Sequence, residues 1–215
     1  MTETTDRHRA PRATGLLIHA AARYDLLVWL FTLGRERALR ERILGFANLK
    51  PGETVLDVGC GTGSLAIAAK RHVGPTGTVC GIDASPEMLA RASKKASKTG
   101  HEVIFRNGAA QALPFPDGQF DAVLNTLMLH HLPRKAREQC AREIHRVLKP
   151  GGRALVVDFA APAYQKKGLL AHFHRHGHVK PGEIIAILGE AGLTIVDSGA
   201  IGFRDLQFVR ASVPG

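Results

Sequence analysis

The sequence contains few cysteines and few large aromatic residues. Among 215 residues there are three cysteines, one tryptophan and two tyrosines. Cys60, Cys80 and Cys140 lie far apart, and no two of them have the Cys-x-x-Cys spacing of a zinc or redox motif. An odd number of scattered thiols argues against a disulfide framework and indicates a reducing compartment. We therefore expect a cytoplasmic protein.

Long apolar runs are also missing. Near the start of the chain the longest run covers residues 26–34, whereas a helix that crosses a membrane needs about 20 apolar residues. A shorter run at 16–22 follows several arginines but has no convincing cleavage site. Neither a membrane span nor a secretory signal is expected.

Acidic residues are scarce relative to basic ones. The chain has 29 lysines and arginines against 19 acidic residues, which gives a formal net charge of +10. Much of the excess lies in two segments with helical spacing, which are expected to present hydrated outer faces. Attraction to an anionic membrane surface or to nucleic acid is the alternative. The residues concerned are Arg91, Lys94, Lys95, Lys98, Arg134, Lys135, Arg137, Arg142, Arg146 and Lys149.

Three regions follow one another along the chain. Residues 1–13 contain few apolar side chains and are expected to form a flexible arm. Residues 14–48 have a helical, apolar pattern interrupted at Gly34, which predicts an N-terminal helical cover or lid. Residues 49–215 are expected to form the main domain, so the chain is a single domain with a well-buried core.

The third region alternates between strand-like and helix-like segments. Such units predict an α/β fold, a doubly wound parallel sheet with helices on both faces. Ser85 is expected to cap the helix that begins at Pro86, and residues 149–152 to end the helix before them. A short link predicts that the last two strands pair antiparallel at one edge. The expected strands are 54–59, 77–83, 102–107, 120–126, 153–160, 193–201 and 203–211, and the expected helices are 64–73, 86–98, 133–148 and 181–192.

The sequence VLDVGCGTG at 55–63 places three glycines directly after the first strand. Glycines at the carboxyl end of a strand allow positive φ and a close approach between backbone and ligand. The following helix presents free N–H groups at the same place. Asp83 lies 20 positions after Gly63, at the end of the second strand, where a carboxylate can accept two ribose hydroxyls. The pattern predicts a nucleotide-like ligand.

Two features distinguish between ligands of this kind. A dinucleotide fingerprint Gly-x-Gly-x-x-Gly that starts at Gly59 requires glycine at position 64, which is Ser64. Asp57 lies two residues before the first glycine, and its carboxylate would repel a pyrophosphate but attract an ammonium or a sulfonium group. The pattern therefore favours S-adenosylmethionine over a nicotinamide dinucleotide.

Several stretches together resemble the motifs of the class I S-adenosylmethionine-dependent methyltransferases. They are LKPGETVLDVGCGTGSLA, ALPFPDGQFDAV followed by LHHL, and EIHRVLKPGGRALVVDF. The match covers residues 49–160 and most resembles the branch with the ubiquinone/menaquinone-biosynthesis and phospholipid methyltransferases. The resemblance implies methyl transfer from S-adenosyl-L-methionine, with S-adenosyl-L-homocysteine as product. It also implies a Rossmann-like seven-stranded sheet with order 3-2-1-4-5-7-6 and an antiparallel last strand.

The resemblance further implies which residues bind the cofactor. The glycine turn would line its methionine and ribose part, Asp57 would hold the turn and the amino group, and Asp83 would bind the ribose. Many relatives have Gly-Asp-Ala-Glu after the third strand, where the Asp accepts from the adenine amino group. Residues 108–111 are Gly-Ala-Ala-Gln instead, so backbone groups and apolar packing are expected to recognise adenine. The candidates are Asp57, Gly59, Cys60, Gly61, Gly63, Asp83, Ala84, Ala109, Ala110 and Asn125.

Two runs of histidine lie where the methyl acceptor is expected. His130 and His131 follow the fourth strand, and an imidazole can take a proton from a hydroxyl nucleophile. They are the catalytic candidates, with packing in the loop as the alternative. Four further histidines alternate between His172 and His178. A lid or loop is the favoured role for that run, ahead of substrate contact or metal binding, and no metal site is predicted.

The acceptor is expected to be a small, apolar or lipid-like molecule. Residues 16–34 are rich in aliphatic side chains, and the positive charge is compatible with peripheral contact with an anionic membrane. RNA or protein acceptors are the alternative, although the basic residues lack interleaved aromatics. A non-catalytic partner subunit that binds the cofactor is a further alternative. The methylated atom and the oligomeric state are left open.

Overall fold

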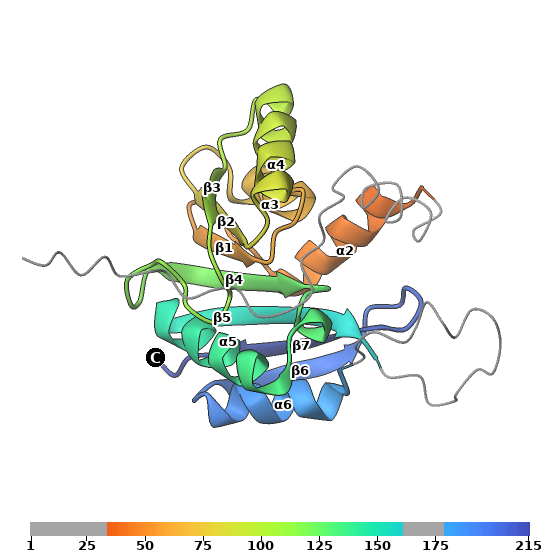
Figure 1. Cartoon of the computed structure of the whole chain (residues 1–215), viewed down its shortest axis with the longest axis vertical. Coiled ribbons are helices and arrows are strands. Elements are labelled where there is room, and N and C mark those ends of the chain that lie inside the picture. The colour runs from red at the N-terminus through yellow and green to blue at the C-terminus, as the bar shows by residue number, and fades with distance from the viewer. Residues whose placement is uncertain (1–33, 161–178) are drawn as a thin grey trace, which may run out of the picture.

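The structure is a computed structural model and describes residues 34–160 and 179–215. Within these residues, seven strands form one sheet with helices packed on it (Figure 1). The strands are β1 (Thr54–Val58), β2 (Thr78–Asp83), β3 (Ile104–Asn107), β4 (Phe120–Thr126), β5 (Leu148–Phe159), β6 (Thr194–Ala200) and β7 (Leu206–Ser212). The helices are α2 (Glu36–Ala47), α3 (Ser64–Val73), α4 (Pro86–Thr99), α5 (Arg134–Val147) and α6 (Pro181–Glu190), with a short 3-10 helix η1 (Leu129–His131).

The strand order is β3-β2-β1-β4-β5-β7-β6, which confirms the predicted topology. Strands β1 to β5 are mutually parallel, so their carboxyl ends lie along the same edge of the sheet. Strand β7 runs antiparallel to both of its neighbours, and β6 forms the sheet edge beside it. The predicted antiparallel pairing of the last two strands is confirmed.

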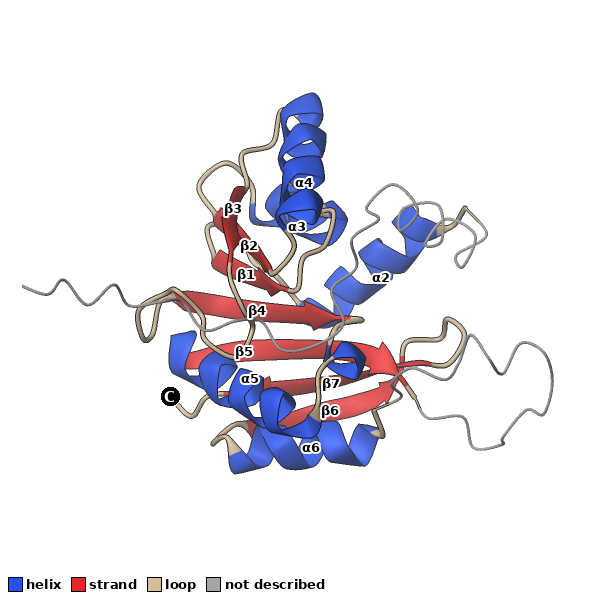
Figure 2. Cartoon of the chain, viewed as in Figure 1, coloured by secondary structure: helices blue, strands red, loops and turns tan. Residues whose placement is uncertain are grey.

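Helices cover both faces of the sheet (Figure 2), and each face has its own hydrophobic core. Along β1, Leu56 packs in the core that includes α5 and α6, whereas its neighbour Val55 packs in the core that includes α2 and α3. Val123 and Leu124 of β4 divide in the same way. Side chains alternate along a strand, so a strand that is apolar throughout has to be covered on both faces. The doubly wound architecture follows from this pattern.

The predicted elements are confirmed within a few residues, and one local prediction is wrong. Ser85 caps α4, because its side chain accepts a hydrogen bond of 3.3 Å from the Met88 N–H and Pro86 occupies the first helical position. Residues 149–152, however, belong to β5 and do not form a separate turn. They lie at a register shift between β4 and β5, where Gly151 adopts a φ of +72°. The extra residues are accommodated as an irregularity of the strand.

The prediction of hydrated basic faces is correct for part of the set only. Arg91, Lys94 and Lys98 on α4 are exposed. Lys95 instead donates to the hydroxyl groups of Thr62 and Ser64 in the glycine turn, at 2.9 and 2.6 Å. On the second segment, Arg137 binds the Leu129 carbonyl and Glu183, Arg146 binds Glu143 and Asp117, and Lys149 binds Asp121.

The N-terminal cover is described only in part. Helix α2 occupies the end of the predicted 14–48 region and buries Leu39, Ile43 and Leu44 against the sheet. The predicted flexible arm at 1–13 and the first part of the predicted cover lie outside the described residues. None of the described helices is long and apolar enough to cross a membrane.

Candidate active site

The candidate site lies where the carboxyl ends of β1, β2 and β4 meet. Val58, the last residue of β1, pairs with Ile82 of β2 on one side and with Asn125 of β4 on the other. The chain leaves β1 for β2 and β3 in one direction, and the later strands lie in the other direction. At such a reversal of strand order the loops separate and leave a crevice outside the strand ends, where α/β sheets bind ligands.

The glycine turn at this point adopts a backbone that only glycine takes without strain. Gly59, Gly61 and Gly63 have φ angles of +76°, +52° and +73°. A Cβ atom on Gly59 would lie 2.4 Å from Cγ of Met128, which follows β4. A Cβ atom on Gly63 would lie 2.7 Å from the Ala92 side chain. The turn is therefore tight against its neighbours, and two of its glycines are required by packing within the protein itself.

Asp83, at the end of β2, is held by backbone N–H groups. Its two carboxylate oxygens accept hydrogen bonds from Gly61 and Ser85, at 2.8 and 2.9 Å. The Asp83 carbonyl accepts from the Asn107 side chain and from the Gly108 N–H at 3.0 and 3.1 Å. Burial raises the pKa of this carboxyl, and the N–H donors partly oppose the shift. The side chain is half-buried and fixed in place, with lone pairs left for further donors.

Asp57 and Asn125 bring unsatisfied acceptors to the same strand ends. Asp57 is 1% exposed, and neither carboxylate oxygen forms a hydrogen bond of normal geometry in the described parts of the chain, although the nearby Ala66 N–H acts to lower its pKa. Burial, together with the charge of Asp83, raises the Asp57 pKa to about 7. The Asn125 amide donates to the Val58 carbonyl at 3.0 Å, while its buried oxygen has no partner among the described residues. Buried acceptors in this state favour a cationic or donating ligand.

The remaining residues predicted to bind the cofactor differ in burial and in their contacts. The Cys60 side chain is buried against Gly81, and burial raises the pKa of its thiol, so a contact with a ligand is left to its backbone. Ala84 is half-buried next to Asp83. Ala109 is buried and bridges to Ala112 in the loop after β3, and Ala110 packs on the core beside it.

His130 forms a contact that the sequence did not reveal. Its Nδ1 atom lies 2.7 Å from Oδ1 of Asp158, near the end of β5, and its backbone N–H donates to Oδ2 of the same carboxylate at 3.1 Å. The Phe159 N–H also donates to Asp158, at 2.7 Å. Because Asp158 accepts from two backbone N–H groups, it acts as an ionised acceptor toward the histidine as well. Nδ1 of His130 is therefore assigned as the donor. Nε2 is then the nitrogen that can accept a proton.

His131 lies beside His130 with a different electrostatic character. The two rings are 3.9 Å apart between centroids. Burial, with the charge of His130 as a second cause, lowers the His131 pKa to about 4. His131 is therefore neutral near pH 7. The two histidines that were equivalent candidates in the sequence are not equivalent in the structure.

The segment between β4 and these histidines is backbone-strained. Leu127 has a φ of +53°, and its N–H donates to the Val157 carbonyl at 2.8 Å. A leucine in the left-handed region is uncommon, and such residues cluster at functional sites where the surroundings hold them. The strain turns the chain sharply from β4 into η1, which carries His130 and His131.

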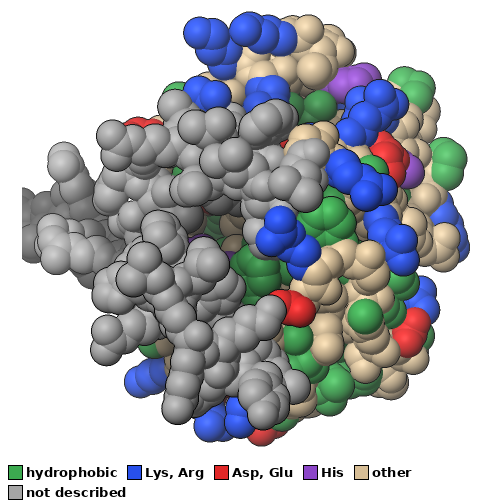
Figure 3. All heavy atoms as spheres, turned by 90° about the vertical axis from the view of Figure 1, so that its right-hand side faces the viewer, with side chains coloured by type: hydrophobic (Ala, Val, Ile, Leu, Met, Phe, Trp, Pro, Cys, Tyr) green, Lys and Arg blue, Asp and Glu red, His purple; other side chains and the backbone are tan. Residues whose placement is uncertain are grey.

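The side of the molecule toward which β4 and β5 run carries many basic side chains. Figure 3 shows lysines and arginines along the upper and right margins of this side. Among the described residues, no group of three or more histidine, cysteine, aspartate or glutamate side chains is arranged to hold a metal ion. The run from His172 to His178 lies outside the described residues.

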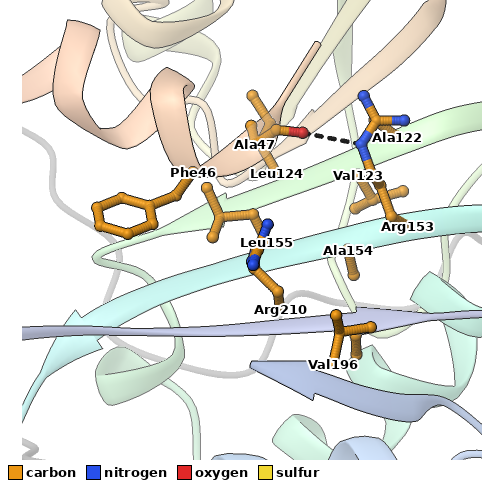
Figure 4. A pocket seen from close by; sticks show the side chains of 11 residues that line it. Phe46, Ala47, Ala122, Val123, Leu124, Arg153, Ala154, Leu155, Val196 and Arg210 are labelled. Carbon is orange, nitrogen blue, oxygen red and sulfur yellow. Dashed lines mark hydrogen bonds between the residues drawn. The ribbon is translucent and has the colours of Figure 1, made fainter. Parts of the chain in front are cut away.

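A cavity away from the strand ends is too small to be the ligand-binding site. It lies beside the end of α2, over β4, β5 and β7, and has a volume of about 60 Å³ (Figure 4). Phe46, Leu155 and Arg153 are among its lining residues, and Arg153 is already bonded to the Ala47 carbonyl and to Glu53. Ligand pockets commonly measure about 300–1,000 Å³. This cavity is a packing gap with room for a few water molecules.

Comparisons with known proteins identify the family to which the chain belongs. Residues 55–152 match a family described as "Methyltransferase domain". A demethylmenaquinone methyltransferase of Thermus thermophilus is 41% identical over 150 residues, which cover 70% of this chain and 67% of that protein. The chain belongs to the class I S-adenosylmethionine-dependent methyltransferases. The resemblance that the motifs indicated is confirmed.

Two further relatives extend this result. A ubiquinone/menaquinone biosynthesis C-methyltransferase UbiE of Enterobacter is 35% identical over 182 residues, covering 83% of this methyltransferase and 71% of the relative. A solved S-adenosylmethionine-dependent methyltransferase of Aquifex aeolicus is 25% identical, with a TM-score of 0.73, and the match covers 90% of this chain and 98% of that chain. The methyltransferase fold therefore includes the regions on both sides of the family match.

Proposed function

We propose that this methyltransferase transfers a methyl group to a lipid-like aromatic acceptor that carries a ring hydroxyl, such as a quinol. The relatives named for demethylmenaquinone and for ubiquinone/menaquinone biosynthesis support this acceptor class. The observation that carries the proposal is the pairing of His130 with Asp158 beside the cofactor site. A hydroxylated ring is the kind of acceptor that needs a base of this type.

The residues at the strand ends fit S-adenosylmethionine. The ligand carries an ammonium and a sulfonium group, and the buried Asp57 carboxyl, whose oxygens form no hydrogen bond of normal geometry among the described residues, is suited to a cation. Asp83, held by Gly61 and Ser85, would accept the ribose hydroxyls with its remaining lone pairs. The side-chain oxygen of Asn125, which has no partner among the described residues, would accept from the methionine end. When bound, the cofactor supplies an activated methyl group.

The adenine end would lie against the loop after β3. Ala84 is half-buried next to the ribose-binding carboxylate, and Ala109 and Ala110 form an apolar turn close to it. In place of an acidic side chain, backbone groups of this loop would recognise the adenine amino group. The tight packing of Met128 on Gly59 and of Ala92 on Gly63 keeps the cradle in one conformation.

In this proposal His130 is the general base. Nε2 takes the proton from the acceptor hydroxyl, while Asp158 holds Nδ1–H and stabilises the imidazolium that forms. Removing that proton raises the electron density on the ring oxygen and on the adjacent ring carbons. Which of these atoms is methylated then depends on the alignment of the acceptor with the methyl group.

Peripheral contact with an anionic membrane fits the same proposal. A lipid-like acceptor resides in a bilayer, and the net charge of +10 favours approach to a negative surface. Sedimentation with vesicles that contain or lack anionic lipid would measure this contact.

The experiment is methyl transfer from labelled S-adenosylmethionine into a cell extract that is then separated into lipid, small-molecule, RNA and protein fractions. We expect label in the lipid fraction, increased when quinones are first reduced to quinols. Label in the RNA or protein fraction would show that the acceptor belongs to that fraction and would overturn the lipid-like acceptor. Cofactor binding without label in any fraction would favour a non-catalytic partner subunit.

A further inference from the structure

The loop after β3 is tied to α5 by a fully engaged arginine. All five N–H groups of Arg146 can be assigned to acceptors. Nε donates to Oε1 of Glu143 at 2.8 Å, and the two terminal nitrogens donate to Oε2 of Glu143, to the side chain of Asp117 and to two backbone carbonyls. Those carbonyls belong to Leu113 and Phe115, at 3.0 and 2.8 Å. A guanidinium saturated in this way fixes the atoms around it.

Glu143 completes the connection from the other side. Its Oε2 atom accepts a hydrogen bond of 2.6 Å from the Leu113 N–H. The Leu113 backbone is therefore held at both its N–H and its C=O by one Arg–Glu pair on α5. Burial would raise the pKa of Glu143, but the hydrogen bonds from Arg146 and Leu113 outweigh it and lower the pKa. The pair is ionised across the neutral range.

The opposite end of the same loop is held at Asp83. The Gly108 N–H donates to the Asp83 carbonyl at 3.1 Å, and the Asn107 side chain donates to the same oxygen. Between these two anchors lie residues 109–112, which close on themselves through the Ala109–Ala112 bridge. This turn has no acidic side chain of its own to receive adenine. Recognition of adenine by this turn therefore depends on where the backbone groups of residues 109–112 are placed.

We propose that Arg146 and Glu143 are positioning residues for cofactor binding, which fix the backbone of residues 109–113 so that it can receive the adenine ring. The inference rests on the proposed function of the strand-end site. Neither side chain contacts the reacting atoms in this proposal, so the pair acts on cofactor affinity and leaves the chemical step unchanged.

The test compares Arg146→Lys and Glu143→Gln with Arg142→Ala, an exposed arginine on the same helix. Lys retains the charge but cannot bridge the carboxylate and two carbonyls, and Gln retains the shape but loses the charge. Calorimetry should show the affinity for S-adenosylhomocysteine reduced about tenfold in each of the first two variants, the effect expected for losing charge-assisted hydrogen bonds. KM for S-adenosylmethionine should rise equally, with kcat at saturation unchanged.

A second readout does not depend on the cofactor. Hydrogen exchange of the amides at 109–113 in the ligand-free protein should be faster in Arg146→Lys and Glu143→Gln but unchanged in Arg142→Ala. The inference would be overturned if both variants lost thermal stability while cofactor affinity and loop exchange stayed at wild-type levels, or if kcat fell with KM unchanged. Failure of the wild-type protein to bind S-adenosylhomocysteine would instead overturn the proposed function.

Discussion

The imidazole of His130 and the carboxylate of Asp158 are joined by a contact of 2.7 Å, although the two residues are 28 positions apart in the chain. The contact links the segment after β4 to the end of β5. Because Asp158 also accepts two backbone N–H groups, it acts as an acceptor and fixes the tautomer of His130. Mutation of either residue is therefore expected to impair the same step.

Replacing Asp158 with Asn should lower kcat by on the order of 100-fold, the contribution of a positioned general base, with cofactor affinity unchanged. His130→Gln should have a similar effect, and the double variant should be no worse than His130→Gln alone, because the two residues act as a unit. Steady-state kinetics with a defined quinol acceptor measures this. Additive losses in the double variant would show that Asp158 does not act through His130.

His131 should titrate with a pKa of about 4 in the folded protein, well below the ordinary value of 6.5. Between these two values the unfolded chain binds a proton that the folded chain does not, so the contribution of this residue to stability is lost as the pH falls from 6.5 toward 4. His131→Gln should reduce the acid sensitivity of thermal unfolding in that range. NMR of the imidazole provides the direct measurement, and a midpoint near 6.5 would contradict the burial argument.

Asp57 should show the opposite dependence on pH. Its folded pKa of about 7 exceeds the ordinary value of 3.8. From pH 4 to 7 the folded protein therefore holds a proton that the unfolded chain has released, and stability falls by about 1.4 kcal/mol for each pH unit as an upper limit. Asp57→Asn should stabilise the ligand-free protein at pH 8 and leave it unchanged at pH 4. Thermal unfolding scans at the two pH values make the comparison.

Although Asp57→Asn should stabilise the ligand-free protein, it should weaken the binding of S-adenosylmethionine. A cationic ligand favours the ionised carboxyl, so wild-type affinity should increase as the pH rises through 7, with release of a proton on binding. Asp57→Asn should bind more weakly and lose this pH dependence. Equal affinities of the wild type at pH 6 and pH 8 would indicate that Asp57 does not interact with the cofactor.

The contact between Gly59 and Met128 gives a paired test of the glycine turn. Gly59→Ala places a Cβ atom 2.4 Å from Met128 Cγ at a φ of +76°. The strained backbone and the overlap should each cost about 1–3 kcal/mol of stability. Met128→Ala in the same chain removes the overlap with Cγ but leaves the Cβ of residue 128 at 2.9 Å, so it should restore part of the overlap cost and none of the backbone strain, as chemical denaturation would show. No recovery in the double variant would mean that the overlap with Met128 Cγ does not contribute to the loss.

The fold was accessible from the sequence because β1, β2 and β4 are short, largely apolar runs that follow a glycine or lead into a glycine turn or a helix cap. The prediction for 149–152 was wrong because Lys-Pro-Gly-Gly suits a turn as well as it suits an irregularity in β5. Only the pairing of β4 with the residues on either side, and the bonds to Val213 and Pro214 after β7, distinguish the two. Local composition carries no information about that pairing.

The site was predictable where its residues follow strand ends, as Asp83 and the glycines do. Asp158 was missed because it lies inside an apolar strand, and its partner comes from another segment. Arg146 was assigned to a hydrated face because a helical pattern identifies which side chains point away from the sheet. It does not show that a loop, here the one after β3, packs over such a side chain. A basic residue shortly after an acidic one on the same face, as in Glu143 and Arg146, was the available signal.

Calorimetry on the wild type and on Asp83→Asn tests directly whether the strand ends of β1, β2 and β4 hold S-adenosylmethionine. The wild type should bind S-adenosylmethionine and S-adenosylhomocysteine and should not bind NAD. The variant should bind both at least about tenfold more weakly, because one carboxylate oxygen that accepts from the ribose is replaced by a donor. Tight binding of NAD, or equal affinity of the two proteins for S-adenosylmethionine, would contradict the account.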